Sequence, residues 1–458
     1  MEVRQGLSAR RIMKRIKGLV SALFLMVIFP TIVQAWSSED ILSHFQVYIT
    51  VQEEYDTNID LAPNRIKRGD FITTISPGLR FSTTSKSPVT GEFRRIPTAE
   101  EKYGMDLDFN AGFNFYSKYH DDNYISLNGL LNAWYALTQN LNFRVRDYLI
   151  RSDDIREQDF SATAIPGQYL PSRTLSRVPW LRNVFEPSLE YKFGRENVFA
   201  FNYRNNVYHT ESRTDQDSLE NYINPRINYW FDIRNGVSFE YGLDLGNFQQ
   251  DPDLVGHMAT GRYTYRFNPR TSVFVNYTHL WRNFDPPGID YVVYNPSLGI
   301  EHAFSPTLSG RLQVGYYRAD PQKGSAVDGP FYDGLLSQRV GRTTYTLLFQ
   351  GGYREDFFTS DNRGFTQYHR VIGRVSHQLL RRMNVGLFGS YEWDKYLEST
   401  ILGRNQIDQI WTIGGSASYQ LFRWLTLSLE AEHSENHSNI DSADYSDYRG
   451  IFRVTATY

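Results

Sequence analysis

Arginine, acidic and aromatic side chains recur at alternate positions along many short segments of this chain, and together they would form a polar surface able to bind a ligand. A guanidinium group forms paired hydrogen bonds with a carboxylate, and an aromatic ring offers a flat apolar face to the C–H surface of a pyranose ring. We predict that the side chains alternating in this way line one polar surface: Arg144, Arg146, Arg226, Arg262, Arg266, Arg311, Arg370, Arg374, Arg449, Arg453, Glu240, Asp244, Glu430, Glu432, Trp134 and Tyr148.

The same charges also allow a purely structural interpretation. The segment with Glu240 and Asp244 lies between a segment with Arg226 and one with Arg262 and Arg266. Opposite charges on neighbouring strands pair and stiffen a wall. The sequence does not offer an unbroken arginine lining. Ligand binding and wall stiffening therefore both remain open for each arginine.

Motifs for catalysis are missing from the sequence. We find no G-x-S-x-G, no H-E-x-x-H and no glycine-rich phosphate loop. His433 and His437 lie four residues apart on one face of an expected strand, and two histidines alone do not make up the four ligands of a typical metal site. We therefore expect no enzymatic activity, no metal site and no cofactor.

The charged rows belong to segments that alternate between apolar and polar residues, which is the pattern of β-strands with one apolar and one polar face. In the final segment, from Tyr445 to Tyr458, Phe452, Val454, Ala456 and Tyr458 alternate with Arg449, Ile451, Arg453, Thr455 and Thr457. An aromatic carboxyl terminus on such a strand is typical of bacterial outer-membrane proteins. The same alternation recurs from Phe45 onwards, and no segment has a convincing helical period.

The connections between these segments alternate in length. Short turns are expected around 138–140, 194–197, 233–236, 268–270, 305–307, 341–342, 380–382 and 422–424, with longer loops rich in Asn and Asp between them. Tight turns at one end and long loops at the other are typical of outer-membrane barrels, in which the turns are periplasmic. The sequence therefore predicts an all-β, transmembrane, antiparallel up-and-down barrel of about 20 strands, with 18 as the alternative and both termini periplasmic.

The two ends and the composition support export to the outer membrane. Basic residues precede an apolar run from Leu19 to Phe29, and small residues end at Ala35, so we predict a cleaved signal peptide over 1–35 and one barrel domain over 36–458. Removing the signal subtracts six Lys and Arg and one Glu, which leaves 42 basic against 50 acidic residues, a net charge of −8. This balance argues against nucleic acid as a partner, since nucleic-acid binding calls for a basic patch or stripe. Aromatic residues make up 15% of the chain and cysteine is absent.

One hairpin resembles a known family. EEYDTNIDLAP (53–63) followed by DFITTISPGLRFS (70–82) resembles the opening hairpin of the outer-membrane β-barrel porins found in exopolysaccharide synthesis and export loci of Gram-negative bacteria. The resemblance covers about forty residues, and the rest of the chain matches only in pattern. It implies export of an exopolysaccharide, with the polysaccharide and a periplasmic export component as partners besides the membrane lipid and the outer-membrane assembly machinery. A general diffusion porin or nutrient channel, and an outer-membrane hydrolase, are the alternatives.

Two connections are too long for plain connectors. The connection from Ser152 to Arg182 either folds into or over the mouth of the barrel and narrows it, or lies disordered outside the membrane. The connection from Ser85 to Lys102 lies on the side of the short turns, where it either contacts a periplasmic partner or is an inert turn.

Overall fold

The computed structural model describes residues 44–83, 102–158, 169–173, 177–212, 216–359, 362–397 and 405–458. The predicted signal peptide and residues 85–101 of the predicted periplasmic connection lie outside these ranges. Cleavage after Ala35 therefore stays a prediction. Within the described ranges, no helix is long and apolar enough to cross a membrane.

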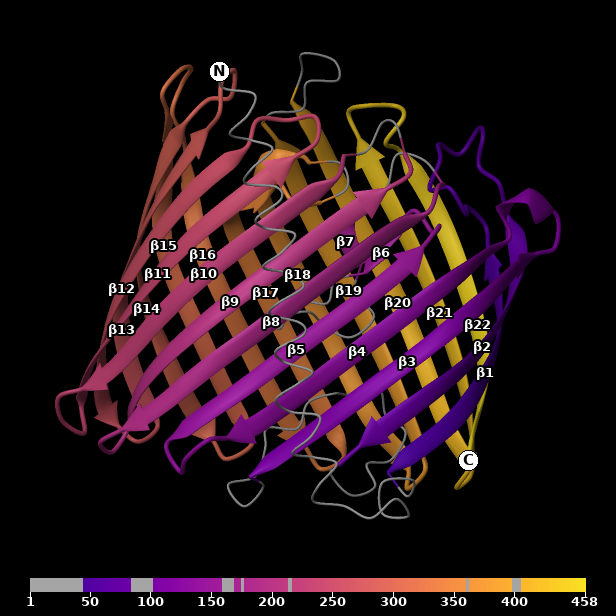
Figure 1. Cartoon of the computed structure of the whole chain (residues 1–458), viewed down its shortest axis with the longest axis horizontal. Helices are drawn as coiled ribbons and strands as arrows, with labels where there is room; N and C mark the ends of the chain where they lie inside the picture. The colour runs from indigo at the N-terminus through magenta and orange to yellow at the C-terminus, as the bar shows by residue number, and fades with distance from the viewer. Residues whose placement is uncertain are drawn as a thin grey trace.

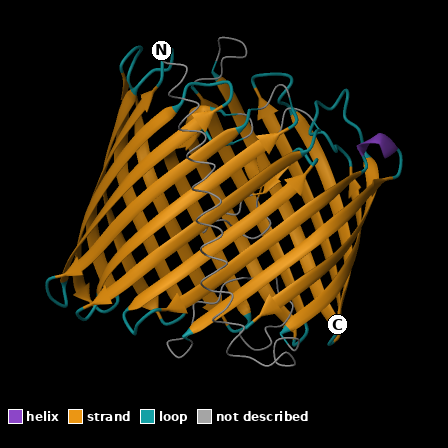
Figure 2. Ribbon diagram, in the orientation of Figure 1, coloured by secondary structure: helices purple, strands orange, loops and turns teal. Residues whose placement is uncertain are grey.

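The described residues form a closed antiparallel barrel of 20 strands, as the sequence predicted. Figure 1 shows the strands tilted steeply around a single wall, and Figure 2 shows that almost every other described residue lies in turns and loops at the two ends. The strands are β1 Phe45–Asp56, β2 Asp70–Ser82, β3 Tyr103–Tyr116, β4 Tyr124–Ala136, β5 Leu141–Ser152, β8 Trp180–Phe193, β9 Asn197–Thr210, β10 Ser218–Trp230, β11 Asn235–Phe248, β12 Leu254–Asn268, β13 Thr271–Phe284, β14 Tyr291–Ser305, β15 Leu308–Pro321, β16 Val327–Val340, β17 Thr343–Asp356, β18 Gly364–Leu380, β19 Met383–Tyr396, β20 Gln406–Phe422, β21 Leu425–Ser438 and β22 Tyr445–Thr457.

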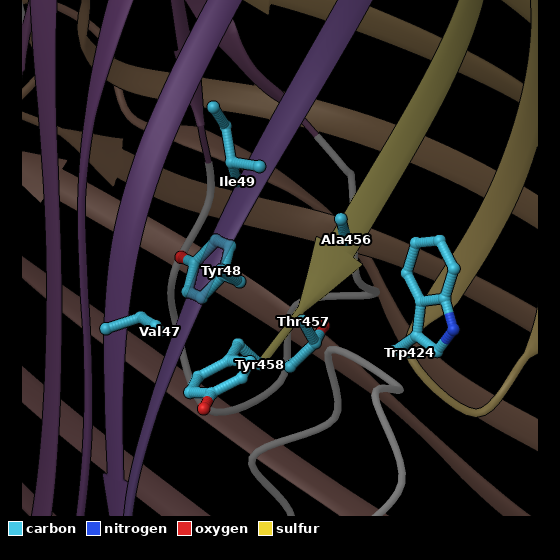
Figure 3. A pocket seen from close by; sticks show the side chains of 7 residues that line it. All are labelled: Val47, Tyr48, Ile49, Trp424, Ala456, Thr457 and Tyr458. Atoms are coloured by element: carbon cyan, nitrogen blue, oxygen red, sulfur yellow. The ribbon is translucent and has the colours of Figure 1, made fainter.

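The barrel closes where the first strand pairs with the last. The register of β1 and β22 runs from Tyr48 opposite Thr457 to Asp56 opposite Arg449. The amide of Tyr458 extends this seam by donating to the carbonyl of Val47 at 2.8 Å. Closure matters because an open strand edge in lipid would leave unpaired N–H and C=O groups, each costing several kcal/mol. Figure 3 shows Tyr458 beyond the end of β22 and beside β1, at a hollow of about 460 Å³ that Trp424 also lines.

The two ends of the barrel differ, and we call them the turn rim and the loop rim. At the turn rim the described connections are 137–140, 194–196, 231–234, 269–270, 306–307, 341–342, 381–382 and 423–424, which confirms the predicted turns. The loop rim carries longer connections, among them the one with the short 3₁₀ helix η1, His120–Asp122. The carboxyl terminus lies at the turn rim (Figure 1). By the rule for outer-membrane barrels, the turn rim is periplasmic.

Alternation along the strands gives the barrel an outer and an inner wall. On β1, the apolar side chains of Val47, Ile49 and Val51 are between 44% and 49% exposed, whereas Tyr48 and Glu54 are buried on the opposite face. An apolar outer wall suits contact with lipid tails. The polar rows predicted from the sequence therefore belong to the inner wall.

Two groups of polar side chains interrupt the apolar outer wall on β5 and β8–β10. Asn183 donates to Asp147 at 2.7 Å. On the next strands, Asn205 and Tyr203 donate to Asn221 at 2.9 and 2.7 Å. Their polar atoms thus find partners within the wall, as a lipid-facing surface requires.

The predicted loop between β5 and β8 is slightly shorter than expected. Ser152 ends β5 and Trp180 begins β8, so the connection spans 153–179 rather than 152–182. It contains a small hairpin of β6, Arg156–Gln158, and β7, Tyr169–Arg173, which pair with each other and not with the barrel.

Arginine should be far more costly on the outer wall than on the inner wall at the same height. Ile413 on β20 is 65% exposed, and its neighbour Thr412 points to the inner wall. We expect Ile413→Arg to lower the free energy of unfolding in liposomes by about 2–4 kcal/mol, the usual cost at the bilayer midplane, and Thr412→Arg to lower it much less. Urea titrations of both variants measure this difference, and equal losses would contradict the assignment of the walls.

Candidate functional site

The sequence-predicted polar residues all lie on inner-wall rows of their strands. Most of the arginines among them form ion pairs. The closest nitrogen–oxygen distances are Arg262–Glu301 2.9 Å, Arg266–Glu196 2.7 Å, Arg370–Glu392 3.0 Å, Arg449–Glu54 3.0 Å, Arg453–Glu430 2.5 Å and Arg146–Glu186 3.7 Å, and Arg311 pairs with Asp333. Pairing across strands therefore accounts for these arginines.

The pairing differs from the sequence expectation around Glu240. Glu240 lies opposite Arg226 in the register but accepts a hydrogen bond from the amide of Asn224 at 2.9 Å instead. Arg262 reaches past β13 to Glu301 on β14. An arginine side chain is long enough to reach past the adjacent strand to the next one. The order of neighbouring strands therefore does not determine which carboxylate an arginine pairs with.

Several inner-wall arginines are also stacked on aromatic rings that lie flat against glycines. A Cβ atom on Gly78 would lie 2.2 Å from the ring of Tyr48, and the guanidinium of Arg80 lies 4.6 Å from the centre of that ring. Arg80 in turn pairs with Asp108 at 2.7 Å. The absent side chain of the glycine lets the ring lie along the wall, and the cation covers the face of the ring.

The same arrangement of glycine, ring, arginine and carboxylate occurs at three more places. The sets are Gly242–Tyr222–Arg204–Glu220, Gly299–Phe274–Arg262–Glu301 and Gly236–Trp230–Arg266–Glu196, with guanidinium-to-ring distances of 5.0, 3.6 and 3.4 Å. Each ring thus has a guanidinium over it whose charge is paired with a carboxylate. The stacks therefore hold these cations at the inner wall.

The loop after β5 is fixed to the closing seam of the barrel. Arg156 of β6 is 9% exposed and pairs with Asp56 of β1 at 2.9 Å and with Asp447 of β22 at 2.7 Å. Arg177, near the other end of the loop, donates to the hydroxyl of Tyr116 on β3 at 2.7 Å. Because β5 is separated from β1 by three strands, the described parts of this loop turn inward along the rim, as the first of the two sequence alternatives expected.

Charged groups of the loop rim reinforce this attachment. Asp60, in the β1–β2 loop, pairs with Arg68 at 2.5 Å and with Arg177 at 3.4 Å. Burial alone would raise the pKa of Asp60, but Arg68 and Arg177 outweigh burial and hold the pKa below its usual value. The contribution of Asp60 to stability is thus fully present above the ordinary carboxyl pKa and is lost only as the pH falls through the lowered value.

A second loop crosses the lumen from the opposite side. Phe357 and Phe358 follow β17 and pack on Phe284 and Phe248, with ring centres 5.3 Å apart in each pair. The carbonyl of Phe358 accepts a hydrogen bond at 3.1 Å from Arg182 on β8. Nine strand-to-strand steps in a ring of 20 separate β8 from β17, so this contact joins nearly opposite sides of the barrel.

The two phenylalanines complete an apolar cluster inside the loop rim. Its buried members are Phe248, Leu254, Leu280, Tyr291, Val293, Tyr317, Ala319, Phe357 and Phe365. Arg282 and Glu355 pair at 2.5 Å beside the cluster. We call the part of the loop rim where the described residues 153–158, 177–179, 357–359 and 362–363 lie the mouth.

Sequence reasoning missed the second loop of the mouth and the pairs Arg204–Glu220 and Arg282–Glu355. The signal for the loop was present, because two adjacent phenylalanines are unusual in a solvent-exposed connection. The pair Arg282–Glu355 has no such signal, since the two residues are far apart in the sequence and meet only through the curvature of the wall.

The histidine pair lacks the surroundings of a metal site. His433 stacks on Tyr448 with ring centres 4.0 Å apart, and its Nδ1 lies 2.9 Å from the carbonyl oxygen of Asp447. His437 lies 3.4 Å from Glu435. Among the residues that the structure describes, no group of three or more His, Asp or Glu side chains could hold a metal ion.

Removing Arg156 should release the loop after β5. The substitution Arg156→Gln leaves Asp56 and Asp447 buried without their cation, which typically costs about 3–5 kcal/mol. We expect faster proteolysis within 153–179 and faster hydrogen exchange there, with an intact barrel. Arg146→Gln, which breaks a more exposed pair, is the control, and equal protease resistance of both variants would contradict the attachment.

Comparison with known proteins finds one family match and several distant solved structures. Residues 243–458, from β11 to the carboxyl terminus, match a family described as "Putative beta-barrel porin 2". No curated protein matches the chain. Similar solved structures include the ferric enterobactin receptor PfeA, 9% identical with a TM-score of 0.49 over 91% of this chain and 81% of that chain. OccAB4 of Acinetobacter baumannii covers 91% and 98% and opdK of Pseudomonas aeruginosa 91% and 99%, each 11% identical with a TM-score of 0.41.

These solved structures are too distant to indicate a substrate. The closed barrel and its apolar outer wall identify the chain as an outer-membrane β-barrel, and its carboxyl-terminal part is similar to the porin family that it matches.

Proposed function

We propose that this barrel is a channel that exports an exopolysaccharide through the outer membrane. The observation that carries the proposal is the inner wall, on which planar arginines lie over aromatic rings along the lumen. Hydroxyl-rich polymers can slide along such a wall, since guanidinium edges donate hydrogen bonds while balanced ion pairs prevent tight trapping. The resemblance of 53–63 and 70–82 to porins of exopolysaccharide loci supports the choice of cargo.

The mouth fits a flexible polymer chain better than a bulky solute. Its two inward loops narrow one end of a wide barrel, while the turn rim has only short described connections apart from that between β2 and β3. A chain entering from the periplasmic side would meet the polar wall first and the narrow mouth last. A periplasmic export component would deliver the chain to the turn rim.

The second candidate is a general diffusion porin or nutrient channel. The near balance of positive and negative groups on the inner wall favours it, because a wall of paired charges passes ions of either sign. The two candidates differ in their response to the polymer.

Planar-bilayer recordings of the refolded protein, with and without polysaccharide from the host strain, separate the candidates. We expect open-channel steps that the polysaccharide interrupts when it is added on the periplasmic side. Current steps that the polysaccharide does not change would favour the diffusion porin. A folded barrel that shows no current steps would contradict both channel proposals.

The mouth should determine the single-channel conductance. Arg182→Ala removes the contact with the Phe358 carbonyl across the lumen, so we expect a larger single-channel conductance. Arg80→Ala, which removes a stacked cation near the turn rim, is the control and should change conductance less. If the two variants conduct alike, the mouth is not the narrowest part of the path.

A further inference from the structure

Three inner-wall arginines differ from the paired ones, and one of them, Arg339 on β16, lies at the end of its strand beside the turn 341–342. Among the described residues, Arg144 on β5 and Arg226 on β10 have no carboxylate within 4.0 Å and no aromatic ring stacked against the guanidinium. The Nε atom of Arg226 is buried without a hydrogen-bond partner. A buried charged donor without an acceptor lowers the stability of the protein unless a ligand accepts its hydrogen bond.

The acidic side chains nearest to these arginines are already engaged. Glu186 pairs with Arg146 at 3.7 Å, and Glu190 pairs with Lys192 at 3.5 Å. Glu240 accepts the amide of Asn224. Four basic side chains, Arg144, Arg146, Lys192 and Arg226, face these three acidic ones, which leaves one positive charge in excess on this part of the wall.

Four amide side chains lie on inner-wall rows near the two arginines. Asn142, Asn202, Asn224 and Asn228 lie on inner-wall rows of β5, β9 and β10. Arg144 lies in the same row as Ser188, Asn202 and Asn224, and Arg226 lies one inner-wall position nearer the turn rim. Three strand spacings, about 14 Å, separate the two strands. Amides bind hydroxyl groups, and free guanidinium groups bind carboxylates.

We propose that this amide–arginine patch of β5 and β8–β10 binds carboxylate-bearing sugar units of the polymer as it moves from the turn rim toward the mouth. The proposal rests on the proposed export function and adds the chemical class of the cargo, an acidic rather than a neutral polysaccharide. The paired arginines elsewhere on the wall act as its frame and do not bind carboxylates.

The test uses oligogalacturonate as the anionic probe and maltohexaose as the neutral one. Each is added on the turn-rim side of the refolded full barrel in a planar bilayer. We expect oligogalacturonate to block the current, and the double variant Arg144→Gln with Arg226→Gln to need about tenfold or more probe for half block, as expected when charge-assisted hydrogen bonds are lost. Maltohexaose should bind more weakly and respond little to the double variant.

The control carries the same change of charge at paired positions outside the ring stacks, Arg311→Gln with Arg453→Gln. If the control loses the block as much as the double variant does, lumen charge in general and not this patch attracts the probe, and the proposal is overturned. A conducting wild-type barrel that oligogalacturonate does not block overturns the patch while leaving the channel intact. If the barrel is silent, the export function fails, and calorimetric titration of oligogalacturonate into wild type and double variant then decides the patch, with equal or absent binding overturning it.

Discussion

The need to satisfy every backbone N–H and C=O group in lipid determines this structure. A sheet can meet that need across a membrane only by closing on itself, and the pairing of β1 with β22 provides the closure. Closure fixes which residues face lipid and which face the lumen, since side chains alternate along every strand. Because the apolar rows face the lipid, the polar rows must face the lumen. The hydrogen bonding of the wall therefore determines which side chains line the lumen.

Charged side chains on the inner wall of a channel must be held in place without blocking the lumen. The glycine–ring–arginine stacks hold the cations at the wall, because each glycine makes room for a ring and each ring has a guanidinium over it. Carboxylates on nearby strands neutralise these cations. At the loop rim the solution differs, because Arg156 and Arg182 are used to hold loops across the opening. The same residue type therefore stiffens the wall along its length and narrows it at one end.

The sequence was sufficient to predict the strands, their number, the turns and the facing of the polar rows, since each depends on local alternation and on turn residues. The terminal strand is an example, with Phe452, Val454 and Ala456 outward and Arg449 and Arg453 inward as expected. Partners such as Glu196 for Arg266 were not predictable, because they depend on the tilt of the strands and on long side chains. The contact of Arg182 with Phe358 depends on the diameter of the closed barrel, which no local pattern encodes. The acidic cargo, the signal-peptide cleavage and the periplasmic partner remain proposals.

The central claim is that the inner-wall rows line the path of transport, and the absence of cysteine from the chain allows a direct measurement. Ser188 and Leu189 are neighbours on β8 that face the inner and the outer wall. Ser188→Cys and Leu189→Cys variants in planar bilayers can be treated with a charged, water-soluble thiol reagent while the current is recorded. Reaction at position 188 should reduce the single-channel current, and treatment of the Leu189→Cys variant should leave the current unchanged. An unchanged current after confirmed reaction at position 188 would show that this wall does not line the conducting path.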